Sequence, residues 1–209
     1  FAHEVRNPIN NISMGLQILS RSFNEDQKNK DMVDRMIHDC DRLTHQMEAV
    51  LAYSKPFDAK FESVDIAILL QRILDRWKPR MARVGVQEFI QKSDNLPIIS
   101  ADPRLLEQVF TNLIGNAVEA MAASEKGTLA VHIDISRTIS NYPQIEVKII
   151  DSGPGIPEDE KNLIFERGYG QNTGLGLFLA REILSLTGTV INETGEPGKG
   201  ARFEISIPK

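Results

Sequence analysis

Cysteine, tryptophan and positive charge are scarce in this sequence of 209 residues. The single cysteine, Cys40, excludes an internal disulfide and fits a reducing compartment. No apolar run approaches the roughly 18 to 20 residues that cross a bilayer. Lysine and arginine number 24 against 29 acidic residues, a net charge of −5. The composition therefore provides no global attraction for nucleic acid or an anionic membrane, and a phosphate-bearing partner must be bound locally.

Two common nucleotide-binding signatures and internal repeats are also absent. The chain has no GxxxxGK[ST] P-loop, and its glycines do not fit GxGxxG after the opening strand of a βαβ unit. Hydrophobic residues make up 41% and charged residues 25%, which is ordinary for a globular protein and excludes a disordered or collagen-like chain. The length suits one large or two ordinary domains. Because the sequence begins at Phe1 and runs at once into a helical pattern, we expect a piece of a longer protein.

The first part of the chain predicts a helical hairpin. Two apolar stripes at steps of three and four residues flank a polar break at 24–26, and Pro56 ends the second helix. A hairpin has one seam and little to bury it against, so we expect a second copy to complete a homodimeric four-helix bundle. The stripes are Ile12, Leu16, Leu19 and Phe23, then Met36, Cys40, Leu43, Met47 and Val50.

After Pro56 helices and strands alternate, which predicts an α+β domain with a mixed sheet covered on one face by helices. Pro79 should bend or end the first of these helices, whereas Asp102 and Pro103 suit the start of the second. The predicted helices are 66–84, 103–123 and 174–186, and the predicted strands are 86–91, 98–101, 128–136, 144–150, 189–193 and 202–207. The domains are then 1–56 and 60–209, with a hinge around 54–60.

The opening HEVRNP places an imidazole, a carboxylate and an amide together. His3 and Asn7 are one helical turn apart with Glu4 beside them. A histidine nitrogen can act as a nucleophile when a neighbouring acid orients the ring and accepts its proton. Taken alone, the pattern is more typical of an exposed histidine near a helix end.

Two asparagines mark the helix predicted over 103–123. Asn112 and Asn116 are one turn apart. Their amide oxygens are too few to hold a metal unaided but suit Mg²⁺, which retains waters and takes further ligands from substrate phosphates. In isolation they could also simply face water.

Two glycine-rich segments follow. Asp151 ends a predicted strand and is followed by Gly153 and Gly155; a carboxylate at the edge of an apolar pocket can accept a hydrogen bond from adenine N6, although DSGPG is also the composition of an ordinary turn. The second segment leads directly into a helix, whose first N–H groups can bind phosphate, and Arg167 can add charge. Its glycines are Gly168, Gly170, Gly174 and Gly176.

These segments, in this order and at these separations, resemble the boxes of the sensor histidine kinases of two-component signalling. HEVRNP resembles the H box, 112–121 the N box, DSGPG the G1 box, 165–169 the F box and TGLGL the G2 box. The resemblance covers essentially the whole chain. It implies that 1–56 is the dimerisation and phosphotransfer hairpin and that 60–209 is an ATP-binding α/β sandwich of the type found in gyrase and mismatch-repair ATPases.

The resemblance also implies a role for each matching residue. His3 would take the γ-phosphoryl group of ATP, with Glu4 as its base and orienter, and Asn7 would position water for dephosphorylating a response regulator. Asn116 with Asn112 would hold Mg²⁺. Further residues would bind the nucleotide: Asp151, Gly153, Gly155, Arg167, Gly174, Leu175 and Gly176.

Three departures from the family pattern affect the site. Glu119 and Ala120 occupy the turn where many relatives carry a lysine or arginine near the phosphates. The lid between 165 and 174 is short, which leaves Arg167 and Gln171 as candidates to touch phosphate. Ala201 replaces a frequent threonine or serine, which removes a polar side chain behind the adenine-binding carboxylate.

The functional prediction is an ATP-dependent kinase that phosphorylates His3 and passes the group to an aspartate on the receiver domain of a response regulator. Related ATPases have glutamate at position 112, whereas an amide is no general base, so transfer is favoured over hydrolysis. The alternatives are mainly phosphatase action on the regulator and a nucleotide-bound dimer scaffold without catalysis. The family implies a cytoplasmic homodimer, as a separate protein or as part of a membrane-attached sensor, with no nucleic acid and no direct membrane contact.

Overall fold

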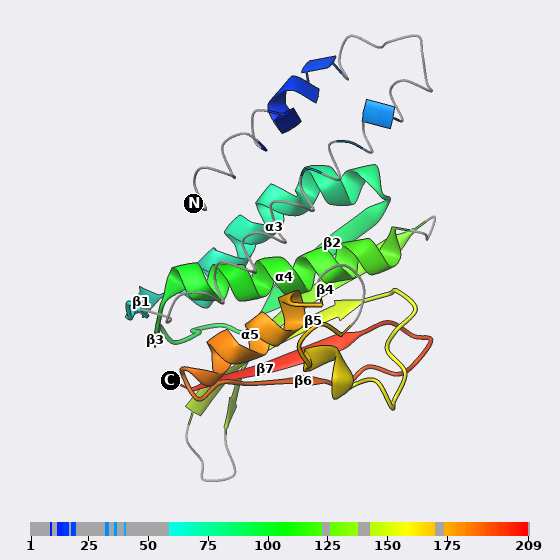
Figure 1. The fold of residues 1–209 in the computed structure, drawn as a ribbon. Coiled ribbons are helices and arrows are strands. Elements are labelled where there is room, and N and C mark those ends of the chain that lie inside the picture. Colours follow the sequence, from blue (N-terminus) through cyan, green and yellow to red (C-terminus); the bar gives the residue numbers. More distant parts are fainter. Residues whose placement is uncertain are drawn as a thin grey trace. The chain divides into compact units, whose positions relative to one another are not determined.

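The structure is a computed structural model in which the chain divides by its internal contacts into residues 1–56 and 57–209. Each unit is described here by itself (Figure 1). The described residues are 9, 12–16, 18–19, 32–33, 36, 40, 59–122, 126–137, 143–169 and 174–208.

Every described residue of the first unit is helical, on both sides of the polar break at 24–26. This agrees with the predicted helices, although the turn and most of the seam lie outside the described residues. Within the stripes Cys40 is buried, whereas Ile12 and Leu19 are 55% and 49% exposed. Apolar side chains on one stripe therefore remain open to solvent in a single copy of the chain.

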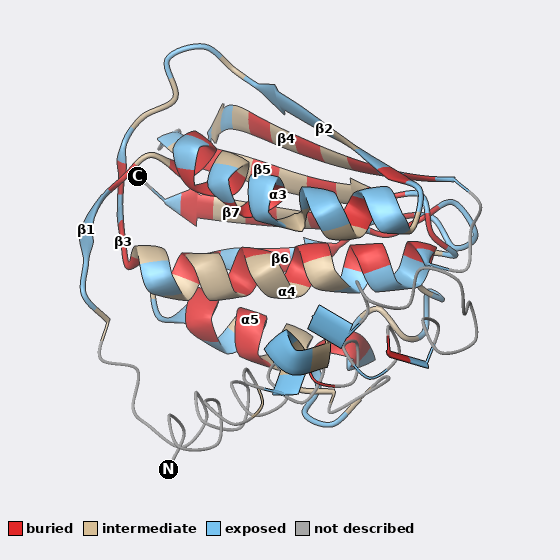
Figure 2. Ribbon diagram, turned by 90° about the horizontal axis from the view of Figure 1, so that it is seen from above, coloured by how far each residue is buried: buried red, intermediate tan, exposed pale blue. Residues whose placement is uncertain are grey.

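The second unit is a two-layer α/β sandwich, as predicted. Its sheet has the strand order β2-β4-β5-β7-β6, parallel between β2 and β4 and antiparallel elsewhere. Helices α3, α4 and α5 lie side by side over one face of this sheet (Figure 2). The elements are β1 (Glu62–Val64), α3 (Ile66–Arg83), β2 (Val86–Lys92), β3 (Ile99–Ala101), α4 (Pro103–Met121), β4 (Gly127–Arg137), β5 (Pro143–Asp151), the short 3₁₀ helix η1 (Leu163–Phe165), α5 (Gly176–Ser185), β6 (Val190–Glu193) and β7 (Arg202–Pro208).

The core lies between the helices and the inward face of the sheet. Alternate residues of β4, β5 and β7 are buried, and the register aligns them in rows such as Val131, Ile149 and Phe203. The helices bury their facing stripes on these rows, with Ile73 of α3 and Leu113 of α4 fully buried. Burial of apolar surface stabilises the fold by roughly 25 cal/mol per Å². The packed core therefore fixes the positions of β5 and α4 relative to each other.

Aspartates begin two of the three helices. Asp65 caps α3 by accepting from the N–H groups of Ala67 and Ile68 at 2.9 and 3.0 Å. Asp102 caps α4 and also accepts from the N–H of Lys60 at 2.8 Å. Burial opposes ionisation of Asp102, but its hydrogen bonds outweigh that cost and lower its pKa to about 2. The predicted α4 start at Asp102 and Pro103 is therefore confirmed.

Three local features differ from the sequence prediction. The strand β1 was not predicted, since three residues carry no period and its form comes from antiparallel pairing with β3. Pro79 does not end its helix, which continues to Arg83. The glycine-rich segment after Asp151 contains η1, whose Ile164 and Phe165 are buried. Each outcome depends on tertiary packing, which overrides the local signal.

Within the part of the chain that the structure describes, no helix combines the length and the apolar character that a membrane span requires.

Candidate functional site

Asp151 is the centre of the site, at the end of β5. Its residue is only 5% exposed, and its Oδ1 accepts hydrogen bonds from the N–H groups of Gly153 and Ala201 at 2.8 and 3.1 Å. Among the described residues, no other group donates to this carboxylate, so Oδ2 is left to accept from a ligand. The geometry orients one oxygen on the backbone and presents the other.

Burial raises the pKa of Asp151 above its ordinary value of 3.8. The hydrogen bonds from Ala201 and Gly153 act in the opposite direction, and the nearby carboxylate of Glu193 adds to the rise. A desolvated oxygen of this kind forms a strong hydrogen bond with a donor that fits and rejects a ligand that lacks one.

The loop after Asp151 is held between two other segments. A Cβ added at Gly153 would lie 3.3 Å from the Cβ of Ala120, near the end of α4. A Cβ added at Gly155 would lie 3.0 Å from both the carbonyl oxygen of Glu196 and the nitrogen of Gly198. A side chain would not fit at either position without displacing a neighbour, so the loop needs glycines there. The predicted residues Gly153 and Gly155 thus lie in the same packed loop as Asp151.

Gly200 packs against the backbone of Asp151 and was not identified from the sequence. Its φ is +98°, and an added Cβ would overlap the carbonyl group of Asp151. The next residue, Ala201, forms two hydrogen bonds with Asp151: its N–H donates to the side-chain Oδ1, and its carbonyl accepts from the Asp151 N–H at 3.0 Å. The polar link at Ala201 is therefore made by the backbone. The paired glycines of GKG before β7 were the available sequence signal.

Alanine at Gly200 should destabilise the protein by about 3 kcal/mol, from the strained positive φ and the overlap with Asp151. Gly198 provides a matched control, because its φ is +81° and nothing lies within 4 Å of an added Cβ. Gly198→Ala should cost only about 1 kcal/mol. Urea unfolding of both variants measures the difference, and equal losses would contradict the assigned role of Gly200.

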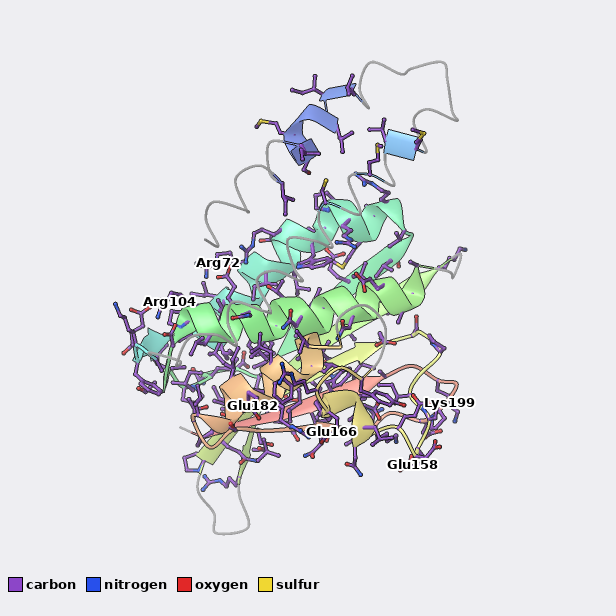
Figure 3. All side chains as sticks on the ribbon, viewed as in Figure 1. Arg72, Arg104, Glu158, Glu166, Glu182 and Lys199 are labelled. Atoms are coloured by element: carbon purple, nitrogen blue, oxygen red, sulfur yellow. The ribbon has the colours of Figure 1, made fainter. Side chains whose placement is uncertain are left out.

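A buried ion pair supports the same corner and was also missed. The Glu193 side chain is fully buried; its Oε1 accepts from the N–H groups of Gly195 and Arg202, and its Oε2 lies 3.5 Å from the Nζ of Lys161. Lys161 also donates to the carbonyl of Gly195 at 2.7 Å. Figure 3 shows the loops that carry Glu158 and Lys199 at the same end of the sheet. No sequence pattern marks a pair that is 32 positions apart.

The two asparagines lie on α4, as predicted. The Nδ2 of Asn112 donates to the carbonyl of Gly176 at 3.2 Å, which links the N box to the first turn of α5 and leaves the Asn112 Oδ1 as an acceptor. Asn116 is exposed one turn further along. Among the described residues no group of three or more His, Cys, Asp or Glu could hold a metal. The pair suits a Mg²⁺ ion that completes its shell with water and phosphate.

A backbone hydrogen bond joins the two flanks of the lid segment. The N–H of Gly168 donates to the carbonyl of Gly174 at 3.1 Å, and Gly174 has a φ of +59° where an added Cβ would overlap Gly168. Leu175 provides no side-chain cap for α5, so the first N–H groups of this helix are available to an anion. Positions 170–173, including Gln171, lie outside the described residues.

Phe165 anchors the entry to the lid. Its ring packs edge-on against Phe203 with centroids 6.3 Å apart, and the Arg181 guanidinium lies 5.6 Å from its centroid. Arg181 also pairs with Glu166 at 3.2 Å. The predicted phosphate ligand Arg167 is exposed beside this anchor. His3, Glu4 and Asn7 lie outside the described residues, so their roles stay predictions.

An orienting carboxylate, two amides on a facing helix and an uncapped helix start suit a purine nucleotide with several phosphates. Two family models match the sequence of this chain: "Histidine kinase-, DNA gyrase B-, and HSP90-like ATPase" over residues 101–209, and "His Kinase A (phospho-acceptor) domain" over residues 1–56. The chain therefore belongs to the sensor histidine kinases, with an ATP-binding catalytic domain.

Individual relatives match this chain along almost its whole length. The chain is 31% identical to the sensor protein kinase PilS of Pseudomonas aeruginosa, covering 99% of this chain and 39% of that protein. It is 28% identical to the sensor histidine kinase ZraS of Escherichia coli K12, covering 99% and 44%. The chain thus spans less than half the length of these curated relatives.

Solved structures agree in fold. Full-length ShkA in complex with AMPPNP has a TM-score of 0.71 at 26% identity, covering 99% of this chain and 44% of that one. The histidine kinase ThkA in complex with the response regulator protein TrrA has a TM-score of 0.71 at 25% identity, covering 100% and 59%.

Proposed function

We propose that this chain is the kinase core of a sensor that autophosphorylates on His3 with ATP and transfers the phosphoryl group to an aspartate of a response regulator. The observation that carries the proposal is Asp151, whose Oδ1 is held by two backbone N–H groups, which leaves Oδ2 to accept from the exocyclic amine of adenine. The family match over residues 1–56 supports His3 as the acceptor.

In this mechanism the chain positions the nucleotide at several points. Asp151 binds the adenine, the first N–H groups of α5 bind phosphate oxygens, and Arg167 adds charge from the lid. Asn112 and Asn116 would hold Mg²⁺, which neutralises phosphate charge when bound. Phosphoryl transfer needs mainly positioning and charge neutralisation, and this arrangement supplies both.

The chemical step uses the N-terminal unit. A ring nitrogen of His3 attacks the γ-phosphorus, the bond from that phosphorus to the bridging oxygen of ADP breaks, and Glu4 accepts the proton from the other ring nitrogen. The amide at position 112 cannot activate water as a base, which favours transfer over hydrolysis. Incubating the intact protein with γ-labelled ATP and Mg²⁺ should give base-stable, acid-labile label, whereas ATP binding without phosphohistidine would favour the scaffold alternative.

The proposed assembly is a homodimer with residues 1–56 as its bundle and 60–209 as each catalytic domain. The exposed Ile12 and Leu19 support a second copy, since a seam of this kind is covered in a four-helix bundle. The proposed partner is a receiver domain, supported by the complex of ThkA with TrrA. A monomer by light scattering at micromolar concentration would contradict the dimer.

A second proposed activity is dephosphorylation of the regulator. It is favoured by Asn7, which follows His3 by one helical turn in H-E-x-x-N and can position a water. Asn7→Ala should slow regulator dephosphorylation about tenfold, through lost positioning, while phosphorylation of His3 stays near wild type. The decay rate of the phosphorylated regulator, measured with the wild-type protein and with Asn7→Ala, tests this prediction. Equal loss of both activities would instead indicate a damaged helix.

A further inference from the structure

A carboxylate lies on the face of α4 that carries the two asparagines. Glu119 follows Asn116 by three residues and Asn112 by seven, which places all three on one helical stripe. Its side chain is 44% exposed, and α4 has no basic residue in its last turn. An anion next to a triphosphate repels it, so this stripe requires a compensating cation from another element.

Arg80 of α3 is that cation. Its Nη2 lies 3.6 Å from the Oε1 of Glu119, and its guanidinium lies 5.1 Å from the ring centroid of Trp77. The Trp77 ring is close to α4, since a Cβ added at Gly115 would lie 3.2 Å from its Cη2. Trp77 therefore provides a platform that directs the guanidinium toward the asparagine stripe.

Two other cations near the site are paired in other parts of it, and a third, Arg167, is proposed to add charge from the lid. Lys161 pairs with Glu158 and Glu193, and Arg181 pairs with Glu166. Arg80 lies 3.6 Å from Glu119, and a planar guanidinium has five N–H donors, so a contact with the carboxylate is compatible with a second contact to a phosphate.

We propose that Arg80 is a phosphate-binding residue of the nucleotide site, supplied by α3, which neutralises Glu119 and donates to the outer phosphates of ATP. The inference rests on the proposed function, because it needs the triphosphate to lie along the asparagines. It also accounts for the absence of a basic residue in the last turn of α4, since the positive charge comes from the neighbouring helix α3.

The test compares binding of ATP with Mg²⁺ and of adenosine, which has no phosphates. Arg80→Ala in the intact protein should weaken ATP binding about tenfold, the loss of one charge-assisted hydrogen bond, and leave adenosine binding unchanged. Arg83→Ala is the matched control, because it removes the same charge from the exposed last turn of α3. Calorimetry measures ATP, and ligand titration by NMR measures adenosine.

A second variant separates charge neutralisation from phosphate contact. Glu119→Gln should tighten ATP binding about threefold by removing repulsion, and adding Arg80→Ala to it should still weaken binding several-fold. Full affinity in that double variant, wild-type affinity in Arg80→Ala, or equal losses for ATP and adenosine would each overturn the inference. A wild-type protein that binds neither ligand would overturn the proposed function itself.

Discussion

Replacing His3 with glutamine should abolish the acid-labile, base-stable label that ATP leaves on the protein. Glutamine retains a polar side chain on the helix but has no ring nitrogen that can attack phosphorus. Since the nucleotide contacts lie in the other unit, ATP affinity should remain within about twofold of wild type. Filter-bound label after acid and base treatment, together with calorimetry, measures both quantities.

Glu4→Gln is the companion variant. It retains the nucleophile and removes the proton acceptor, so the label should form about 10² to 10⁴ times more slowly but on the same residue. Label that persists undiminished in His3→Gln would place the acceptor elsewhere and reject the proposed reaction, whatever the state of the nucleotide site.

Asp151→Asn should weaken ATP binding about 100-fold, close to 3 kcal/mol. The two N–H groups of Gly153 and Ala201 hold the side-chain oxygen, so the new amide nitrogen takes the place of Oδ2. A donor then faces the N6 donor of adenine where an acceptor is needed. The loss should be equally large for ADP, since both nucleotides share the base, and calorimetry measures it.

The same variant should not unfold the protein, because of the direction of the Asp151 pKa shift. The folded pKa lies above 3.8, so the folded state holds this proton more tightly than the unfolded chain does. Stability from the neutral form is full below 3.8 and is lost as pH rises through the folded pKa. At pH 7 the free wild-type protein therefore carries a cost that asparagine removes, and urea unfolding should show no loss.

Asp134→Asn is the control for Asp151. This residue lies on the neighbouring strand β4 and accepts from the Ser93 hydroxyl at 2.8 Å. Its conversion should leave ATP affinity within about twofold, since it takes no part in the site. If both amide variants bound ATP like wild type, the assignment of Asp151 to adenine would be wrong.

Local chemistry made much of the catalytic unit predictable. Alternating apolar residues identified β4, and the aspartate and proline at 102 and 103 identified the start of α4. Asn112, Asp151 and the glycines of the loops were found because each belongs to a short motif whose spacing carries its meaning. The motifs did not give the mutual placement of these residues, since Asn112 lies in the middle of α4 and meets Gly176 of α5 only through packing.

Features made by distant residues were not predictable in this way. Gly200 behind Asp151, Lys161 with Glu193, and Arg80 with Glu119 each join segments about 30 to 50 positions apart, and no local signal pairs one member with the other. The strand β1 belongs with them, since only pairing with β3 makes three residues a strand.

By itself the sequence determined the family, and it predicted the two functional regions and the residues proposed to do the chemistry, because those depend on residue type and short spacing. Only the tertiary structure decided which oxygen of Asp151 the backbone holds, which glycine packs behind it and which arginine lies beside the carboxylate on α4. Packing selects those contacts among many that the sequence allows, and their energies arise only when the helices and the sheet are brought together.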